Sequence, residues 1–279
     1  MQDYSTSNPP PMSHRIFPIL VVYQTTLSQS ITYQTLLRGC NVERFLVYDN
    51  SPAAFENQEA LPAAAIYHRD TANGGLPAAY NYGAKLAREL GYTHVLLLDC
   101  DTTFPEGAWE VYLSHLSDEE IMGPSLLLAD GRPFSPCYVG GWKVKGVHLP
   151  AGQHSLQQYH LVNSGLCVPL ALFEAAGGYS PQVRLDFADF QFQQRVLRHA
   201  STFRLLPIVG KQDFSNDERS TPKLLRRFRL YLESARHCQF DTNRQRLQHH
   251  VAVWRHLLAL TLRQRSLVFL RAYFQKQTL

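Results

Sequence analysis

Two aspartates at the end of an apolar segment are the first residues of this sequence whose types and spacing suggest chemistry. Asp99 and Asp101 follow the segment 93–98, and Cys100 stands between them. Because side chains alternate along an extended chain, both carboxylates are expected on one face and Cys100 on the other. Two carboxylates together suit a hard cation, Mg²⁺ or Mn²⁺, that could neutralise a departing diphosphate. The alternative is a polar strand end that only caps the next turn.

A second acidic pair opens a predicted helix. Asp186 and Asp189 stand at the beginning of the segment 187–199, which has helical character. A carboxylate within hydrogen-bonding distance of a sugar hydroxyl could act as a general base and take its proton. The alternative is structural, since acids in a first helical turn are stabilised by the helix dipole.

A turn of asparagine and glycine precedes another predicted helix. Asn73 and Gly75 belong to the Asn-Gly-Gly turn at 73–75, just before the helix predicted at 76–90. Glycines let a ligand approach the backbone closely, and a helix N-terminus offers free N–H groups to an anion. The turn is neither a P-loop nor the glycine motif of dinucleotide-binding proteins. A plain helix-entry turn is the alternative.

The elements that must position these residues alternate between strand and helix. Strands are predicted at 17–23, 45–48, 64–68 and 93–98, with helices at 30–39 and 76–90. Alternation of this kind predicts an α/β fold with a mostly parallel sheet flanked by helices. Ligands of such sheets bind beyond the carboxyl ends of the strands, where Asp49, Asp99 and Asp101 fall.

The pattern is less regular after residue 105. Helices are predicted at 109–116, 170–176 and 187–199, and strands at 121–128 and 137–147. Trp142, beside the Gly-Gly turn at 140–141, is a candidate platform for stacking on a sugar ring. From residue 221 the chain is predicted to be helical to its end, in at least two pieces.

Composition limits the class of protein. Of the 279 residues, 45% are hydrophobic, as in an ordinary folded protein. Residues 1–15 are predicted to be a disordered leader because they are polar and rich in proline. The 5 cysteines include no Cys-x-x-Cys pair, which disfavours a disulfide framework or a structural zinc site. The absence of a secretory signal and of the ~20 apolar residues that a membrane span needs predicts a cytoplasmic protein.

The charge is distributed unevenly. Residues 219–279 contain 13 Lys or Arg against 2 Asp or Glu, whereas the whole chain has a net charge of only +4. A basic segment behind an acidic body predicts docking on an anionic membrane surface, which would place the protein on the inner face of the membrane. The alternative is a pair of solvated, arginine-rich helices. No nucleic-acid partner is expected, since few aromatic residues are interleaved for base stacking.

The order and spacing of seven short motifs carry a resemblance to a known family. They are Tyr-Asp-Asn-Ser at 48–51, Asn73-x-Gly75, Asn-Tyr-Gly at 81–83, Leu-Asp-Cys-Asp at 98–101, Asn-Ser-Gly at 163–165, Gly-Gly-Tyr at 177–179, and Asp186-x-x-Asp189 leading to Arg195. The chain resembles the family 2 inverting glycosyltransferases with the GT-A fold, over about residues 17–215. It is most similar to the bacterial rhamnosyltransferase-like branch, in which Asp-x-x-Asp replaces the usual Glu-Asp pair.

The resemblance implies a domain plan and a reaction. It implies a Rossmann-like GT-A domain over 16–218, with a nucleotide-binding half at 16–104 and an acceptor half at 105–218. A basic helical extension follows at 219–279. The reaction would be in-line displacement with inversion, moving rhamnose or another hexose from a UDP- or dTDP-linked donor to a saccharide or lipid-linked acceptor.

The resemblance also assigns roles to individual residues. Asp49 would contact the nucleotide base, with Asn73 and Gly75 bordering its site. Asp99 would contact the donor and, with Asp101, hold the divalent metal. Asp189 would be the catalytic base. The acceptor side would be formed by Asp186, Asn163 and Ser164. Trp142 is assigned to the same side because it stands beside the Gly-Gly turn, and not because of the resemblance.

One position departs from the family pattern and keeps alternatives open. Many relatives carry a histidine after the last core strand that assists metal or diphosphate binding, and Gln212 stands at that place. A non-catalytic nucleotide-sugar- or glycan-binding protein of the same fold is therefore one alternative. A sugar nucleotidyltransferase is another, although Gln24-Thr25-Thr26 after the first strand lacks the glycine-rich phosphate loop that such an enzyme favours.

Overall fold

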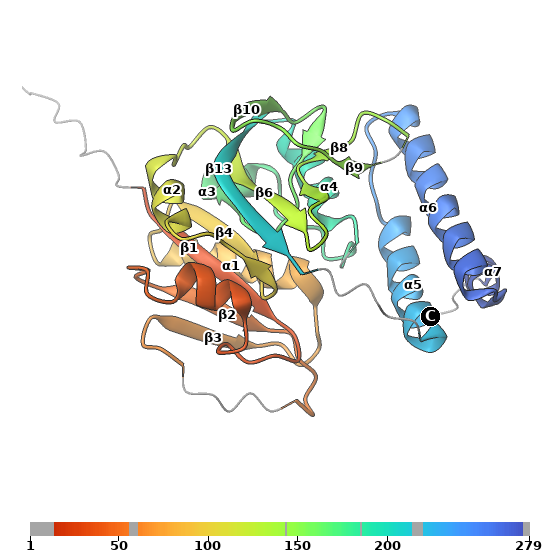
Figure 1. Cartoon of the computed structure of the whole chain (residues 1–279), viewed down its shortest axis with the longest axis horizontal. Helices are drawn as coiled ribbons and strands as arrows, with labels where there is room; N and C mark the ends of the chain where they lie inside the picture. Colours follow the sequence, from red (N-terminus) through yellow and green to blue (C-terminus); the bar gives the residue numbers. More distant parts are fainter. Residues whose placement is uncertain (1–13, 56–60, 143, 185, 214–219, 276–279) are drawn as a thin grey trace, which may run out of the picture.

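The structure is a computed structural model that describes residues 14–55, 61–142, 144–184, 186–213 and 220–275. The leader predicted at 1–15 lies outside the described residues, apart from His14 and Arg15. In the described part, one large twisted sheet forms the centre of the molecule, and a group of helices stands beside it (Figure 1). The strand order of the sheet is β10-β13-β6-β12-β4-β1-β2-β3, with β5 and β7 attached to β13 and β6.

The first half of the sheet is fully parallel. Its strands are β1 (Ile16–Val22), β2 (Phe45–Asp49), β3 (Ala65–Arg69) and β4 (His94–Asp99). The predicted strands and the helix α1 (Gly75–Glu89) are confirmed within about two residues at each end. The helix predicted at 30–39 is shorter: it starts at Ile31 and ends at Leu37, and its main part, η1 (Tyr33–Leu37), winds as a π-helix.

The second half of the sheet contains a strand that runs the other way. β12 (Leu166–Pro169) is antiparallel to both β4 and β6 (Ile121–Leu128). Beyond β6 lie β13 (Thr202–Gln212), which is parallel to β6, and β10 (Gly152–Ser155), which is antiparallel to β13. The short strands β5 (Thr102–Thr103) and β7 (Pro133–Ser135) complete the sheet. The sheet is thus mostly parallel, with β12 as an antiparallel member near its centre.

The segment 137–147, predicted to be extended around a Gly-Gly turn, forms two short strands rather than one long one. These are β8 (Cys137–Tyr138) and β9 (Lys145–Gly146), and β8 pairs with both β9 and β11 (Tyr159–His160) in a separate small sheet. The Gly-Gly turn at 140–141 interrupts the extended chain between β8 and β9, so the segment folds back on itself.

Helices cover both faces of the large sheet, which explains its almost uninterrupted apolar strands. In β1, Phe17 and Ile19 face one apolar core while Leu20 and Val22 face the other. The first core is completed by α1, α3 (Leu170–Ala175) and α4 (Ala188–Val196), and the second by η1 and α2 (Ala108–Ser114).

The chain after residue 220 is helical, as predicted, in the described residues. α5 (Thr221–Arg236), α6 (Asn243–Gln264) and α7 (Val268–Phe274) pack around their own apolar cluster, which includes Phe228, Leu257 and Phe269. α6 starts at a capping box, in which the Thr242 hydroxyl accepts from the backbone N–H of Gln245. In the part of the chain that the structure describes, no helix is long and apolar enough to cross a membrane.

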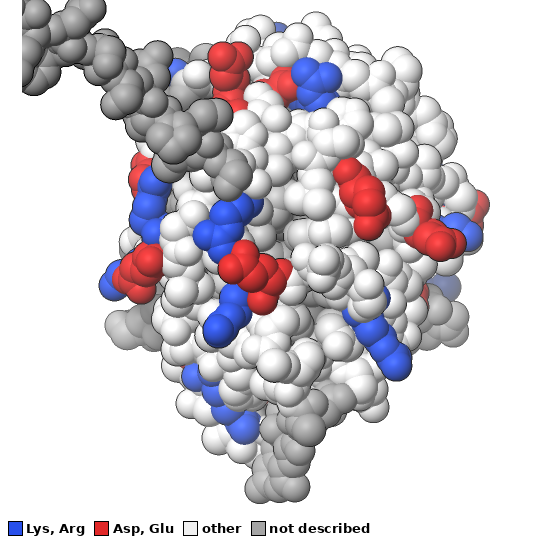
Figure 2. Space-filling view, turned by 90° about the vertical axis from the view of Figure 1, so that its left-hand side faces the viewer, with Lys and Arg blue, Asp and Glu red and all other residues white. Residues whose placement is uncertain are grey.

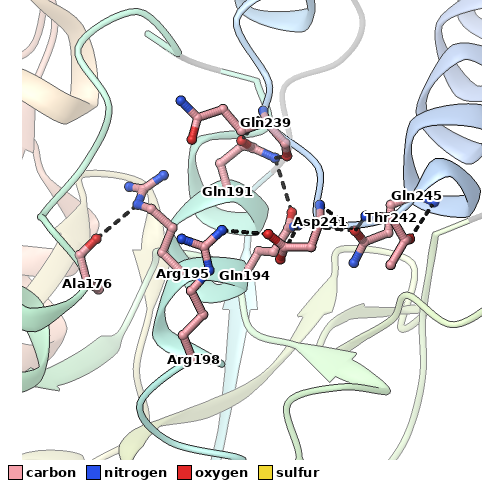
Figure 3. Close-up of polar contacts among 9 residues, drawn as sticks. All are labelled: Ala176, Gln191, Gln194, Arg195, Arg198, Gln239, Asp241, Thr242 and Gln245. Atoms are coloured by element: carbon pink, nitrogen blue, oxygen red, sulfur yellow. Dashed lines mark hydrogen bonds and ion pairs between the residues drawn. The ribbon is translucent and has the colours of Figure 1, made fainter.

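The extension is joined to the sheet domain through α4, as Figure 3 shows. Gln191 and the backbone of Gln239 exchange hydrogen bonds of 3.0 and 2.7 Å. Arg198 forms an ion pair of 2.5 Å with Asp241. Phe187, just before α4, also packs against the apolar clusters of both bodies. The helix that carries Asp189 in its first turn is therefore in direct contact with the basic extension.

Candidate active site

A cleft of two adjoining depressions lies where the parallel strands end. The first has a volume of about 390 Å³ and holds Asp99, Asp101 and Gln212. The second has a volume of about 420 Å³ and holds Asp186. Four residues line both depressions, namely Phe134, Val162, Asp189 and Arg227. The structure therefore brings the two predicted acidic pairs, 87 positions apart between Asp99 and Asp186, into one cleft.

Strand register places Asp99 beside a residue far away in sequence. Leu166 of β12 pairs with Leu97 of β4, so Ser164 reaches the end of β4, where its hydroxyl donates a 2.5 Å hydrogen bond to the Asp99 carboxylate. The Tyr80 hydroxyl donates to the other Asp99 oxygen at 3.3 Å. Burial raises the pKa of Asp99, and these two hydrogen bonds oppose that rise. Asp99 is thus held rigidly, with a hydrogen bond on each carboxylate oxygen.

Asp101 lies beside Gln212, the residue that departs from the family pattern. The Gln212 amide nitrogen donates to Asp101 Oδ1 at 2.7 Å, and its oxygen accepts from the Thr102 hydroxyl at 2.5 Å. Burial, with the neighbouring Asp99 charge, raises the pKa of Asp101 to about 6. Cys100 also borders this depression, but its side chain packs against the second apolar core together with Leu96 and Leu98, which agrees with the alternation predicted from the sequence.

The donor set tests whether a divalent metal fits here. Among the described residues, no three His, Cys, Asp or Glu side chains are gathered into a metal cage. Gln212 donates to Asp101 Oδ1 only, and the Asp213 side chain belongs to the same depression. Mg²⁺ commonly binds one or two carboxylates together with substrate phosphates and waters. The residues therefore fit a metal that binds with the phosphates of a nucleotide, and they do not form a complete site without one.

Asp189 occupies the first turn of α4, at the junction of the two depressions. Phe187, the residue before α4, has a φ of 71°, a left-handed conformation that is strained for a residue with a large side chain. The Asp189 carboxylate accepts from the backbone N–H of Phe190 at 2.9 Å. Burial, helped by the charges of Asp186 and Asp99, raises the pKa of Asp189 to about 7. A carboxylate with such a pKa exchanges protons readily near neutral pH.

Arg227 reaches the cleft from the basic extension. Its guanidinium lies 3.8 Å from Asp186 Oδ1. Among the described residues, it is the only Lys or Arg that lines the first depression, which holds the carboxylates of Asp99, Asp101, Asp189 and Asp213. Sequence analysis missed Arg227, since nothing local distinguishes it from the other arginines of α5.

The Asn-Ser-Gly turn at 163–165 is fixed from several sides. The Tyr179 hydroxyl donates to Asn163 Oδ1 at 2.6 Å. Gly165 has a φ of 85°, and a Cβ there would lie 2.8 Å from the Tyr112 hydroxyl, so only glycine fits. Asn163 and Ser164 line the first depression together with Asp99. The tyrosines that hold this turn were not foreseen, because their partners are distant in sequence.

The residues predicted to border the nucleotide lie around the ends of β2 and α1. Asp49 is fully buried and accepts from the Tyr67 hydroxyl at 2.6 Å and the Ser51 N–H at 2.8 Å. Direct contact between Asp49 and a base therefore requires Tyr67 to move. Asp70, which sequence analysis did not single out, accepts from the Gly74 N–H at 2.8 Å and so holds the 73–75 turn.

Asn73 and Gly75 shape that turn through their backbones. Both have positive φ angles, of 51° and 79°. The Asn73 carbonyl accepts from the Arg184 guanidinium, and a Cβ at Gly75 would lie 2.6 Å from the Arg184 carbonyl oxygen. Neither residue is among those that line the first depression, although Leu76 is.

Two predicted residues lie away from the cleft. Trp142 is 54% exposed and lines neither depression, and the carbonyls of Gly140 and Gly141 before it accept from Arg244 and Gln248 of α6. Arg195 donates to the Ala176 carbonyl at 3.0 Å, as Figure 3 shows, so it joins α4 to the turn after α3.

A larger depression of about 650 Å³ lies at the other ends of the strands, beside the first residues of β6 and β13. It is lined by Asp118, Glu120, His199 and Arg204, and Arg204 is paired with Glu120 at 2.7 Å. It contains none of the residues that sequence analysis singled out for chemistry.

Comparison with known proteins gives matches in structure alone. No protein-family model matches the chain, and no curated protein matches it. GalNAc-T7 in complex with UDP, GalNAc and Mn²⁺ superposes with a TM-score of 0.55 at 12% identity, over 91% of this chain and 58% of that chain. S. aureus TarS 1-349 in complex with UDP-GlcNAc superposes with a TM-score of 0.54 at 14% identity, over 93% of this chain and 78% of that one.

The chain has the GT-A glycosyltransferase fold. The similarity spans almost all of the chain, although the chain covers little more than half of GalNAc-T7. At these identities the comparison establishes the fold and leaves activity to be argued from the site.

Proposed function

We propose that this chain is an inverting glycosyltransferase that uses a nucleoside-diphosphate sugar. The observation that carries the proposal is the meeting of the Asp99–Asp101 pair with Asp189 in one cleft on a GT-A fold. In the proposed division, residues 16–104 bind the nucleotide, 105–218 bind the acceptor and 219–279 form the extension. Membership of family 2 and of its rhamnosyltransferase-like branch is part of the hypothesis, as is a rhamnosyl or other hexosyl donor.

The donor is proposed to lie along the strand ends. A UDP- or dTDP-linked sugar would place its base near Asp49 and the turn of Asn73 and Gly75. Asp99, already fixed by two hydrogen bonds, would contact the donor. Asp101 would hold Mg²⁺ or Mn²⁺, which when bound supplies a Lewis acid for the diphosphate. The structures of GalNAc-T7 with UDP and Mn²⁺ and of TarS with UDP-GlcNAc support this donor class on the same fold.

Arg227 is proposed to add a second positive charge. A nucleoside diphosphate would enter a depression whose walls carry several carboxylates, and it needs cationic partners there. The guanidinium of Arg227 lines this depression while it contacts Asp186. It can therefore interact with the diphosphate as negative charge develops on the leaving group.

The chemical step is a single displacement. An acceptor hydroxyl attacks the anomeric carbon, and Asp189 accepts its proton as the new C–O bond forms. The bond between the anomeric carbon and the diphosphate oxygen breaks, and its electron pair leaves with the nucleoside diphosphate. Attack opposite the leaving group inverts the anomeric configuration. Asp186, Asn163 and Ser164 would orient the acceptor from the remaining wall of the cleft.

The acceptor is proposed to be a saccharide or a lipid-linked saccharide. Residues 219–279 contain 13 basic and only 2 acidic residues. This positive charge supports docking of the extension on an anionic membrane, where lipid-linked acceptors are found. The protein would then act at the cytoplasmic face, without a membrane-spanning helix in its described part.

One observation favours a second candidate, a non-catalytic nucleotide-sugar-binding protein. Gln212 engages Asp101 and Thr102 with both ends of its amide, where a metal-assisting histidine was expected. A protein of this kind would bind the nucleotide without transfer.

A thermal-shift panel tests the donor site. The intact protein is heated with UDP, dTDP and their sugars, with and without Mn²⁺ or Mg²⁺, because a ligand bound only by the folded state raises the melting temperature. We expect a metal-dependent shift that is lost in Asp101→Ala and kept in Asp118→Ala, a control in the separate depression at the other ends of the strands. No shift with any nucleotide would exclude the proposed donor site.

A further inference from the structure

α6 presents apolar side chains on two different sides. Val253, Leu257 and Leu260 point inward and belong to the core of the extension. On a second side, Leu247, Trp254, Leu258 and Leu262 are 53%, 39%, 48% and 75% exposed. Their spacing of seven, four and four residues puts them along one stripe of the helix. A helix that only covered a core would need the first side alone.

The stripe continues into an aromatic cluster with α7. The Trp254 ring lies 4.9 Å from that of Tyr273 and 6.1 Å from that of Phe274, which is 67% exposed. Leu267, between α6 and α7, is 61% exposed. Leu247, Trp254, Leu258, Leu262, Leu267 and Phe274 together form what we call the outer face. Trp and Tyr beside exposed leucines are typical of residues that lie at a membrane–water interface.

The charge around the outer face has one sign. Between residues 243 and 274 there are six arginines and no Asp or Glu: Arg244, Arg246, Arg255, Arg263, Arg265 and Arg271. The side of the molecule remote from the extension differs, because Figure 2 shows basic and acidic side chains interspersed there. A positive, arginine-rich border around exposed leucine and tryptophan matches an amphipathic helix that lies in an anionic bilayer surface.

We propose that the outer face docks on an anionic bilayer, with Trp254, Leu258 and Leu262 entering the headgroup boundary. A second copy of the chain is a poorer occupant, since pairing two such faces would bring two arginine-rich borders together without any acid between 243 and 274 to offset them. An anionic lipid surface offers both the apolar layer and the opposite charge.

Docking would hold the cleft near the bilayer. α5 lies between α6 and the sheet domain (Figure 1), and it carries Arg227 into the cleft. This consequence rests on the proposed function, because it presumes a lipid-linked acceptor. The docking itself does not depend on catalysis.

Flotation of the intact protein with vesicles tests the proposal. We expect binding to vesicles of phosphatidylcholine with phosphatidylglycerol, at least tenfold weaker binding to phosphatidylcholine alone, and partial loss in high salt. The double variant Leu258→Ser/Leu262→Ser should bind anionic vesicles at least tenfold more weakly. Leu113→Ser is the matched control, since Leu113 is 45% exposed on α2. Both variants should keep the melting temperature of the parent, because these side chains are exposed.

Three outcomes would overturn the proposal. They are failure of the parent to bind anionic vesicles at low salt, equal binding by the double variant and the parent, and a dimeric mass in solution that the double variant returns to the monomer. The nucleotide-induced thermal shift is measured in parallel and should be the same in the double variant. A parent that binds vesicles but gives no nucleotide shift would refute the proposed function and leave the docking surface intact.

Discussion

The two sides of the cleft are held by different kinds of contact. On the strand side, Asp99 and Asp101 sit at the end of β4, where register and hydrogen bonds from Ser164 and Gln212 fix them. On the helix side, Asp186, Asp189 and Arg227 meet where α4 touches the extension. The strand side is thus determined by the sheet itself, whereas the helix side depends on how two bodies pack. Substitutions on the two sides should therefore have different effects on transfer rate, UDP affinity and stability.

The largest effect is expected from Asp189→Asn, which keeps the shape of the helix side and removes its base. Loss of a positioned general base typically costs about 10²–10⁴-fold in rate. Transfer should fall by this amount in steady-state kinetics, while UDP affinity measured by calorimetry stays within about twofold of the parent. A variant that loses UDP binding together with rate would show that Asp189 serves the donor site rather than catalysis.

Arg227→Ala tests whether the helix side also serves the donor. A hydrogen bond between charged groups contributes about 1.5–3 kcal/mol, so UDP affinity should fall at least about tenfold. Arg229→Ala is the matched control, since Arg229 is exposed on the same helix and lines neither depression. Equal UDP affinity in the two variants would contradict the role proposed for Arg227 and leave the extension outside the donor site.

The pH dependence of kcat/KM tests whether Asp189 is the catalytic base. Burial raises the pKa of Asp189 to about 7, and the carboxylate must be unprotonated to accept a proton. We therefore expect kcat/KM to rise with pH through about 7, and to fall about tenfold for each pH unit below it. A profile that stays flat between pH 5 and 8 would mean that the group which limits the rate is not Asp189.

The smallest effect is expected at the joint shown in Figure 3. Asp241 pairs with Arg198, and their side chains are 43% and 55% exposed, so water screens the pair. Asp241→Ala should lower the free energy of unfolding by less than about 1 kcal/mol, as measured in urea. A loss several times larger, with weaker UDP binding, would show that this ion pair holds the helix side in place.

The strand side was largely predictable from sequence because its signals are local. β4 is buried on both faces, so its sequence is an apolar run that predicts a strand, and Asp99 and Asp101 come at the end of that run. The position of Gln212 beside Asp101 was anticipated from the order of motifs, and the structure shows the hydrogen bond that joins them.

The other features of the cleft and its surroundings were harder to foresee because they depend on long-range contacts. β12 is only four residues long and ends in Pro169, so its sequence is difficult to distinguish from that of a loop. This strand nevertheless places Ser164 beside Asp99. Arg227 is one of 13 basic residues in its segment, and only tertiary packing selects it. Trp142 was selected for its ring and neighbouring glycines, but the chain folds back between β8 and β9 and leaves it on the surface.

The most direct test of the central claim is to follow the donor by proton NMR with the intact protein. The panel contains UDP- and dTDP-linked hexoses with Mg²⁺, and water serves as the acceptor when no saccharide is supplied. We predict release of nucleoside diphosphate and a sugar product whose first-formed anomer is inverted relative to the donor, both abolished in Asp189→Asn. A retained anomeric configuration, or binding of the nucleotide with no release from any donor, would contradict the assignment of an inverting glycosyltransferase.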